Sequence, residues 1–186
     1  MTTAVTDLLN SSAYRSSPYE KLQQLGIVLP SRPAPIGNFV THVLEGNMLY
    51  LSGQGPTEPD GRLYSGRVGD GVTTEQAYQH ARLTAINLIA VMHEALGDLS
   101  RVRRIVKLLG LVNASPAFAE HHKVINGCSD LMAEVFGESG IHARSSLGIA
   151  SLPGNITVEI EAIVAVDERE PMRFSTTAAA PRTASI

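Results

Sequence analysis

The sequence predicts an α+β fold: a two-layer sandwich in which two long helices cover one face of a mixed, mostly antiparallel sheet. Three observations predict this class, namely a capped helical segment at 74–96, a second helical segment at 116–136, and two strand-like runs near the end of the chain. The expected order is helix, strand, strand, loop, helix, strand, helix, strand, strand. With 186 residues, of which 44% are hydrophobic, the chain can bury one core as a single domain.

The N-terminal extension, residues 1–34, is expected to contain one short helix. Ser17 suits the N-cap, and Pro18 suits the first helical position. Glu20, three residues after the cap, completes a capping box, and Gly26 provides a stop.

Composition also sets the domain boundaries. The proline-rich stretch 29–35 excludes a helix or a central strand and should be an extended connection. The main domain is then expected at 35–167. The Ala/Ser/Thr-rich segment 168–186 has little apolar pattern and is predicted to be a disordered tail.

The first strands of the main domain are expected at 39–44 and 48–52. The intervening Glu-Gly-Asn supplies the residues that a tight hairpin requires. The next segment, 54–72, is rich in glycine and proline and is predicted to be irregular, with a short strand near 63–64.

The helix at 74–96 has the strongest local signals. Thr73 and Gln76 form a capping box, apolar residues recur along one face, and Gly97 ends the segment. A strand is expected at 102–112, and a second helix should begin at Pro116 and continue to about residue 136.

The last two strands are predicted at 145–152 and 157–166, where apolar and polar residues alternate around a Pro-Gly-Asn turn. This hairpin would bring Arg144 close to Glu159, and a guanidinium is a good two-pronged receptor for a substrate carboxylate. Glu159 and Glu161 are two positions apart and share one strand face, so the pattern leaves open which of them faces a site.

Three ordered motifs resemble the reactive intermediate deaminase family, also called RidA or YjgF-like. The motifs are ARSSLGIASLPGNITVEIEAI at the C-terminal end, IGNF at the start of the main domain, and SGQGP between them. The match covers about 35–166. It is best to a longer branch of the family, which carries an additional N-terminal helix.

The resemblance implies a chorismate-mutase-like or YjgF-like fold that assembles as a homotrimer around a central barrel, with ligand sites at subunit interfaces. It implies a hydrolase acting on C–N bonds, which deaminates reactive 2-imino or 2-enamino acids to 2-oxo acids and ammonia. The implied partner is a small substrate with a carboxylate, and neither metal nor organic cofactor is expected.

The resemblance also implies roles for particular residues. Arg144 matches the arginine that grips the substrate carboxylate, and Glu159 matches the glutamate that orients water and moves protons. The backbone of Gly53 and of Ser146 would contact the substrate. Phe39 stands where tyrosine is usual, so the pocket wall is kept while a hydroxyl is lost.

Simpler interpretations exist for each residue taken alone. Arg144 could form a structural ion pair, Glu159 could be an ordinary strand carboxylate, and Glu161 a surface residue. Ser146 stands where many relatives have cysteine. A nucleophilic pair of Ser146 with His142 is conceivable, but nothing supplies an orienting acid.

Charge and composition argue against several other classes of protein function. A net charge of −3 with no long Lys/Arg run argues against nucleic-acid binding. The sequence shows no signal peptide and no apolar stretch long enough to span a bilayer. We therefore expect a cytoplasmic location and no membrane role. Cys128, the single cysteine, is predicted to be buried and inert, and the pair His121-His122 lacks a metal-site pattern.

The alternative function is a non-catalytic trimeric protein that binds a small carboxylate or acts as a chaperone-like surface. A carboxylate binder needs Arg144 but not a water-positioning glutamate. The presence of both Arg144 and Glu159 therefore favours the enzyme.

Overall fold

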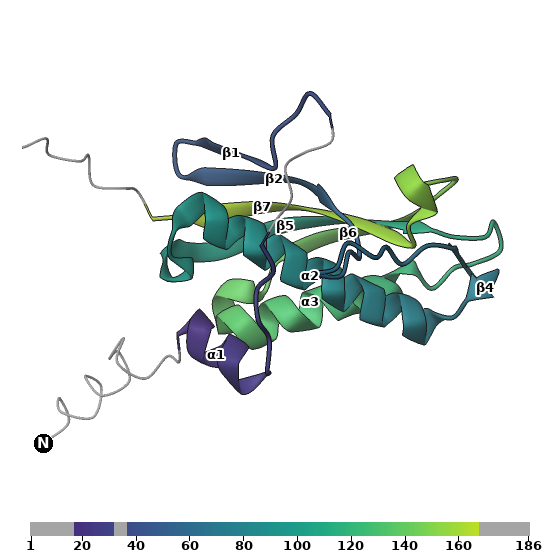
Figure 1. The fold of residues 1–186 in the computed structure, drawn as a ribbon, viewed down its shortest axis with the longest axis horizontal. Coiled ribbons are helices and arrows are strands. Elements are labelled where there is room, and N and C mark those ends of the chain that lie inside the picture. Colours follow the sequence, from purple (N-terminus) through teal and green to yellow (C-terminus); the bar gives the residue numbers. More distant parts are fainter. Residues whose placement is uncertain (1–16, 32–36, 168–186) are drawn as a thin grey trace, which may run out of the picture.

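A computed structural model describes residues 17–31 and 37–167 as one five-stranded sheet with two long helices across one face (Figure 1). A small third helix lies beside the helical layer. The predicted tail 168–186 and the first sixteen residues lie outside the described residues. The elements are α1 (Pro18–Gln24), β1 (His42–Glu45), β2 (Met48–Gln54), β3 (Arg67–Val68), β4 (Gly71–Val72), α2 (Thr74–Leu96), β5 (Val102–Asn113), α3 (His121–Phe136), β6 (Ala143–Ile149) and β7 (Val158–Val166).

The sheet is mixed and mostly antiparallel, as the sequence predicts. Its strand order is β1-β2-β7-β5-β6, and only β5 and β6 run parallel within it. The strand faces beneath α2 and α3 carry the hydrophobic core, to which Leu49, Ile105, Leu108 and Ile160 contribute fully buried side chains. The α+β sandwich is therefore confirmed.

The capped helices begin where the sequence places them. In α1, Ser17 accepts from the backbone of Glu20, and the Glu20 side chain accepts from the backbone of Ser17. Thr73 and Gln76 do the same for α2, which ends at Gly97 in the left-handed conformation with φ 72°. Local chemistry fixes these ends before any packing is considered.

The two long helices cross at a point where no side chain fits. A Cβ atom at Gly127 of α3 would collide with the carbonyl oxygen of Tyr78 in α2 and would lie 3.1 Å from the backbone nitrogen of Arg82. Glycine at this position lets the helix backbones approach closely.

The first hairpin is confirmed, but its first strand is shorter than predicted. β1 starts at His42, so Phe39 lies in a bend before the strand. In the irregular segment that follows, Leu63 makes only an isolated bridge with Thr57. The regular pairing there is instead between β3 and β4.

The start of the second long helix was predicted too early. α3 begins at His121, and Pro116 lies in a turn closed by the Phe118 N–H, which donates to the Ser115 carbonyl at 3.0 Å. The Ser115 N–H in turn donates to Val68 at 2.9 Å. Pro116 is therefore a turn residue. Proline suits this position as well as it suits the first turn of a helix.

The predicted terminal hairpin is wrong. β6 and β7 do not pair with each other, because β5 lies between them, parallel to β6 and antiparallel to β7. The connection crosses the end of β5, where the Asn113 N–H donates to Thr157 at 2.9 Å and the Asn113 side chain donates to Asn155 and Ile156. Alternation identified both strands but carries no information about which strand lies between them.

No helix within the described ranges is long and apolar enough to cross a membrane.

Candidate functional site

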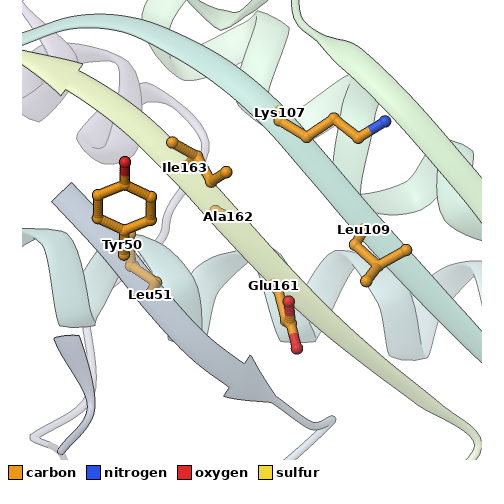
Figure 2. Close-up of a pocket in the computed structure, with 7 residues that line it drawn as sticks. All are labelled: Tyr50, Leu51, Lys107, Leu109, Glu161, Ala162 and Ile163. Carbon is orange, nitrogen blue, oxygen red and sulfur yellow. The ribbon is translucent and has the colours of Figure 1, made fainter. Parts of the chain in front are cut away.

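None of the described helices covers the sheet face opposite α2 and α3. Along β7, Val158 and Ile160 are fully buried beneath the helices, whereas Glu159, Glu161 and Ile163 alternate with them and face the other way. A hollow of about 320 Å³ lies on this open face, and Figure 2 shows side chains from β2, β5 and β7 around it. Its lining is Tyr50, Leu51, Lys107, Leu109, Glu161, Ala162 and Ile163.

Glu159 lies directly against the backbone of Gly53. The register between β2 and β7 shifts between Leu51 and Gln54. A Cβ atom at Gly53 would lie 2.8 Å from both Cγ and Cδ of Glu159, which is closer than real Cβ contacts. The absence of a side chain at Gly53 therefore creates the space that the Glu159 carboxyl group occupies. The structure brings together these two residues of the predicted site.

The electrostatic surroundings of Glu159 differ from those of an ordinary surface carboxylate. Burial raises the pKa of Glu159 above its usual 4.5, and the nearby negative charge of Glu161 raises it further. Glu161 is exposed and lines the hollow, whereas Glu159 is half-buried. A carboxylate with a raised pKa suits proton transfer near neutral pH, so Glu159 is the better candidate base.

Arg144 lies on the other side of the sheet. Its partner in the parallel register is Leu108, which is fully buried beneath the helices. The guanidinium extends to α3, where Nη1 donates to Asn126 Oδ1 at 3.0 Å and to Ser129 Oγ at 2.8 Å. Nη2 donates weakly to the His122 carbonyl at 3.4 Å. Arg144 is thus oriented by neutral acceptors, and no carboxylate of residues 17–31 or 37–167 forms an ion pair with it.

Ser146 follows on the same strand, and its hydroxyl is buried with no hydrogen-bond partner among the described residues. The conceivable pair of Ser146 with His142 does not form. His142 Nε2 instead lies 3.0 Å from Ser129 Oγ, and its Nδ1 lies 2.6 Å from the Gly140 carbonyl. Ser146 therefore has no base beside it of the kind that activates a nucleophile.

Arg144 and Glu159 do not meet within one chain, contrary to the expectation from the hairpin. They lie on opposite faces, on strands separated by β5. Two strand spacings amount to roughly 10 Å across the sheet. The predicted residues thus form two groups: Gly53 with Glu159, and Arg144 with Ser146.

Phe39 is 53% exposed, and its ring lies close to Gly37. The neighbouring segment is tied to β2, because the Ser52 hydroxyl donates to the Val40 carbonyl at 2.7 Å and the Ser52 N–H donates to Thr41 at 3.0 Å. Ser52 directly precedes Gly53, so the segment that carries Phe39 is bonded to the residue before Gly53.

The sequence interpretation missed Asn126 and Ser129. They are three residues apart in α3 and share a helix face, and this is the face that meets Arg144. Two polar residues at this spacing, between the buried positions Ile125 and Leu131, were the available signal. Such residues in an apolar stretch need a partner, and an arginine on an adjacent strand is one.

The remaining reactive groups point to no metal centre. No cluster of three or more His, Cys, Asp or Glu side chains that could hold an ion occurs between 17 and 31 or between 37 and 167. Cys128 is fully buried, and burial raises its pKa to about 12, so the thiol stays protonated as the sequence analysis expected.

Known proteins resemble this chain over most of the residues that form the fold. Residues 20–162 match the family model described as "YjgF/chorismate mutase-like, putative endoribonuclease". The chain is 45% identical over 144 residues to the protein TCP17 of Trypanosoma cruzi, covering 77% of this chain and 90% of TCP17. It is 32% identical over 142 residues to a 2-iminobutanoate/2-iminopropanoate deaminase of Dermatophagoides farinae, covering 76% of this chain and 95% of that enzyme.

A solved structure agrees in sequence and in fold. The crystal structure of Atu1372 from Agrobacterium tumefaciens, a protein of unknown function, is 46% identical with a TM-score of 0.75, covering 81% of this chain and 94% of Atu1372. The family model covers most of the main domain, including the motif residues Gly53, Arg144 and Glu159. The chain therefore belongs to the RidA/YjgF-like family.

Proposed function

We propose that this protein is a deaminase that hydrolyses reactive 2-imino or 2-enamino acids to 2-oxo acids and ammonia. The observation that carries this proposal is the half-buried Glu159, whose carboxyl group lies against Gly53 and has a raised pKa. A base in such surroundings serves proton transfer, whereas binding a carboxylate ligand would not require it. The relative named 2-iminobutanoate/2-iminopropanoate deaminase supports the substrate class.

The chemistry needs one base and one carboxylate receptor. Ionised Glu159 takes a proton from water while the water oxygen bonds to the imine carbon, and the C=N π electrons move to nitrogen. Glu159 then gives that proton to the nitrogen of the carbinolamine. Glu159 next takes the hydroxyl proton of the carbinolamine and passes it to the same nitrogen, so the oxygen forms the carbonyl as the C–N bond breaks and ammonia leaves. One imine and one water thus give one 2-oxo acid and one ammonia.

Arg144 would hold the substrate carboxylate through paired N–H donors. Backbone groups near Gly53 and Ser146 would complete the binding site. The imine carbon is already electrophilic, so most of the contribution of the protein is to fix substrate and water in one geometry.

We propose further that two chains form each site. The separation of Arg144 from Glu159 within one chain is the reason, because a second chain can bring its own Arg144 to the Glu159 of the first. The open face offers an apolar surface for this contact, with Val43, Tyr50 and Leu147 each about half exposed. A closed homotrimer would give every chain the same two contacts.

Two other functions fit less well. Ribonuclease activity, suggested by the description of the family model, would require an RNA-binding surface, yet the net charge is −3 and no basic cluster stands out in the sequence. A non-catalytic carboxylate binder would use Arg144 but has no need of Glu159 in its unusual surroundings.

The test is a coupled assay that generates 2-iminopropanoate or 2-aminoacrylate in situ and follows its loss. Wild type should accelerate the loss. Arg144→Ala should raise KM strongly, Arg144→Lys should recover only part of the binding, and Glu159→Gln should abolish turnover while carboxylate binding persists. Arg103→Ala, which removes an exposed arginine on β5, is the matched control.

The opposite results are equally informative. A folded wild type that gives no acceleration would contradict the proposed reaction. Unchanged turnover in Glu159→Gln, with carboxylate binding lost in Arg144→Ala, would favour the binding protein instead.

A further inference from the structure

Arg144 is the outermost member of a hydrogen-bonded chain that leads back to the backbone before β6. The chain runs from Arg144 through Ser129 to His142 and ends at the Gly140 carbonyl. We propose that Ser129 and His142 are positioning residues that hold the Arg144 guanidinium with one edge turned to the substrate carboxylate. This inference rests on the proposed function.

The donor and the acceptor of each hydrogen bond in this series follow from where the protons lie. A backbone carbonyl can only accept, so the 2.6 Å contact with Gly140 places the proton of neutral His142 on Nδ1. Nε2 is then an acceptor, and Ser129 donates its hydroxyl proton to it at 3.0 Å. The lone pairs of Ser129 Oγ are left for Arg144, whose Nη1 donates at 2.8 Å.

The surroundings keep the His142 ring neutral, as this arrangement requires. Burial lowers the pKa of His142, the bond to Gly140 acts in the opposite direction, and the positive charge of Arg144 lowers the pKa again. A neutral ring with Nδ1–H has one acceptor nitrogen, and Ser129 uses it.

The contacts of Arg144 leave a specific pair of donors. Nη1 uses both of its N–H bonds, to Ser129 and to Asn126, and Nη2 uses one toward His122. Of the five N–H groups, those that remain are on Nε and Nη2. A carboxylate bridges these two nitrogens side-on, in the two-pronged geometry that only arginine offers.

This anchoring addresses a particular difficulty of β6. The strand is at the edge of the sheet, so a long side chain on it has few neighbours from other strands to restrict its rotamers. Ser129 supplies the restriction from α3, and His142 fixes the hydroxyl of Ser129. Without this pair, substrate binding must order the arginine, and affinity falls.

The kinetic test compares Ser129→Ala with Ser129→Thr, and His142→Phe with His142→Gln. Ser129→Ala should raise KM about tenfold and leave kcat within about twofold, since one hydrogen bond to a charged group is lost. Ser129→Thr retains the hydroxyl and should restore KM. His142→Gln retains a side-chain acceptor and should exceed His142→Phe in affinity. Ser100→Ala, which removes an exposed hydroxyl bonded to Asp98, is the control.

A second measurement does not depend on turnover. In ¹⁵N-labelled protein, the Arg144 Nη1–H that donates to Ser129 should be protected from exchange in wild type and in Ser129→Thr. Protection should be lost in Ser129→Ala. If wild type hydrolyses no imine, the proposed function fails, and this signal still decides whether Ser129 positions Arg144.

Two results would overturn the inference. One is equal Arg144 protection and equal KM in Ser129→Ala and wild type. The other is a Ser129→Ala variant whose kcat and unfolding midpoint both fall and are not restored by threonine, since that pattern belongs to a purely structural serine.

Discussion

Gly53 and Glu159 approach each other so closely across β2 and β7 that a methyl group at Gly53 would occupy the space of the Glu159 side chain. The glycine has an ordinary backbone conformation at this point, since it is not among the positive-φ positions of the described residues. Its value therefore lies in the missing side chain. The same approach places the Gly53 backbone beside the proposed base.

Gly53→Ala should reduce kcat/KM by about 100-fold, because the new methyl group displaces the carboxyl group by a distance comparable to a bond length. Steady-state kinetics on an imino acid generated in situ would measure this. Gly55→Ala is the matched control, since its methyl group would crowd the flexible end of Ile156 and would lie at an ordinary contact distance of 3.8 Å from the Val158 carbonyl oxygen. Full activity in Gly53→Ala would show that the position of Glu159 is unimportant.

The pH dependence of kcat/KM should report Glu159. The carboxylate must be ionised to accept a proton from water, so activity falls as the pH drops through its pKa, which lies above 4.5 because of burial and the charge of Glu161. In Glu161→Gln the second cause is removed, and the pKa of Glu159 falls. The acid limb should therefore move to lower pH. A limb that stays in place or moves upward would contradict the assignment.

Leu147→Glu tests the role of the open face in assembly. Leu147 is 51% exposed on β6, and Leu63, 48% exposed in the irregular segment before β3, provides a control of similar exposure. Light scattering should give wild type and Leu63→Glu three times the chain mass of 19.8 kDa. Leu147→Glu should give one chain mass, because burying an unpaired carboxylate in an interface is costly. A trimeric Leu147→Glu variant would exclude this part of the face as the interface.

Gly127→Ala should lower the free energy of unfolding by about 3 kcal/mol, because its methyl group would overlap the Tyr78 backbone at the crossing of α2 and α3. The sign of the change in unfolding free energy shows whether the helices are tightly packed at this point. The same substitution at an exposed helix position stabilises by about 1 kcal/mol. Urea unfolding followed by circular dichroism distinguishes the two, and a gain in stability would mean that the helices separate easily at Gly127.

Local chemistry made the helical layer predictable from sequence. The capping boxes of α1 and α2 and the left-handed Gly97 depend on residues within one turn of each helix end, so no long-range information is needed. Pro116 was less informative, since proline suits both a turn and a first helical position. Bonds to Ser115 and Val68 decide between the two, and they are not visible in the sequence.

Strand neighbours and the site were harder to predict. Alternation placed Glu159 and Glu161 on one face correctly, because the period of a strand is a local property. It could not show that β5 separates β6 from β7, and so it placed Arg144 and Glu159 together. The proposed roles of Gly53, Phe39 and Ser146 came from resemblance to a family, and they stay predictions.

The opposite-face placement of Arg144 and Glu159 has a consequence for mixtures of inactive proteins. If each site takes its arginine from one chain and its glutamate from another, Arg144→Ala and Glu159→Gln chains refolded together should regain activity. Random assembly at equal amounts would leave about a quarter of the interfaces with both functional groups intact. At a substrate concentration far below the KM of Arg144→Ala, each variant alone shows almost no activity, and so would the mixture if a single chain supplied both residues. Dilution below the dissociation constant of the trimer should abolish the recovered activity.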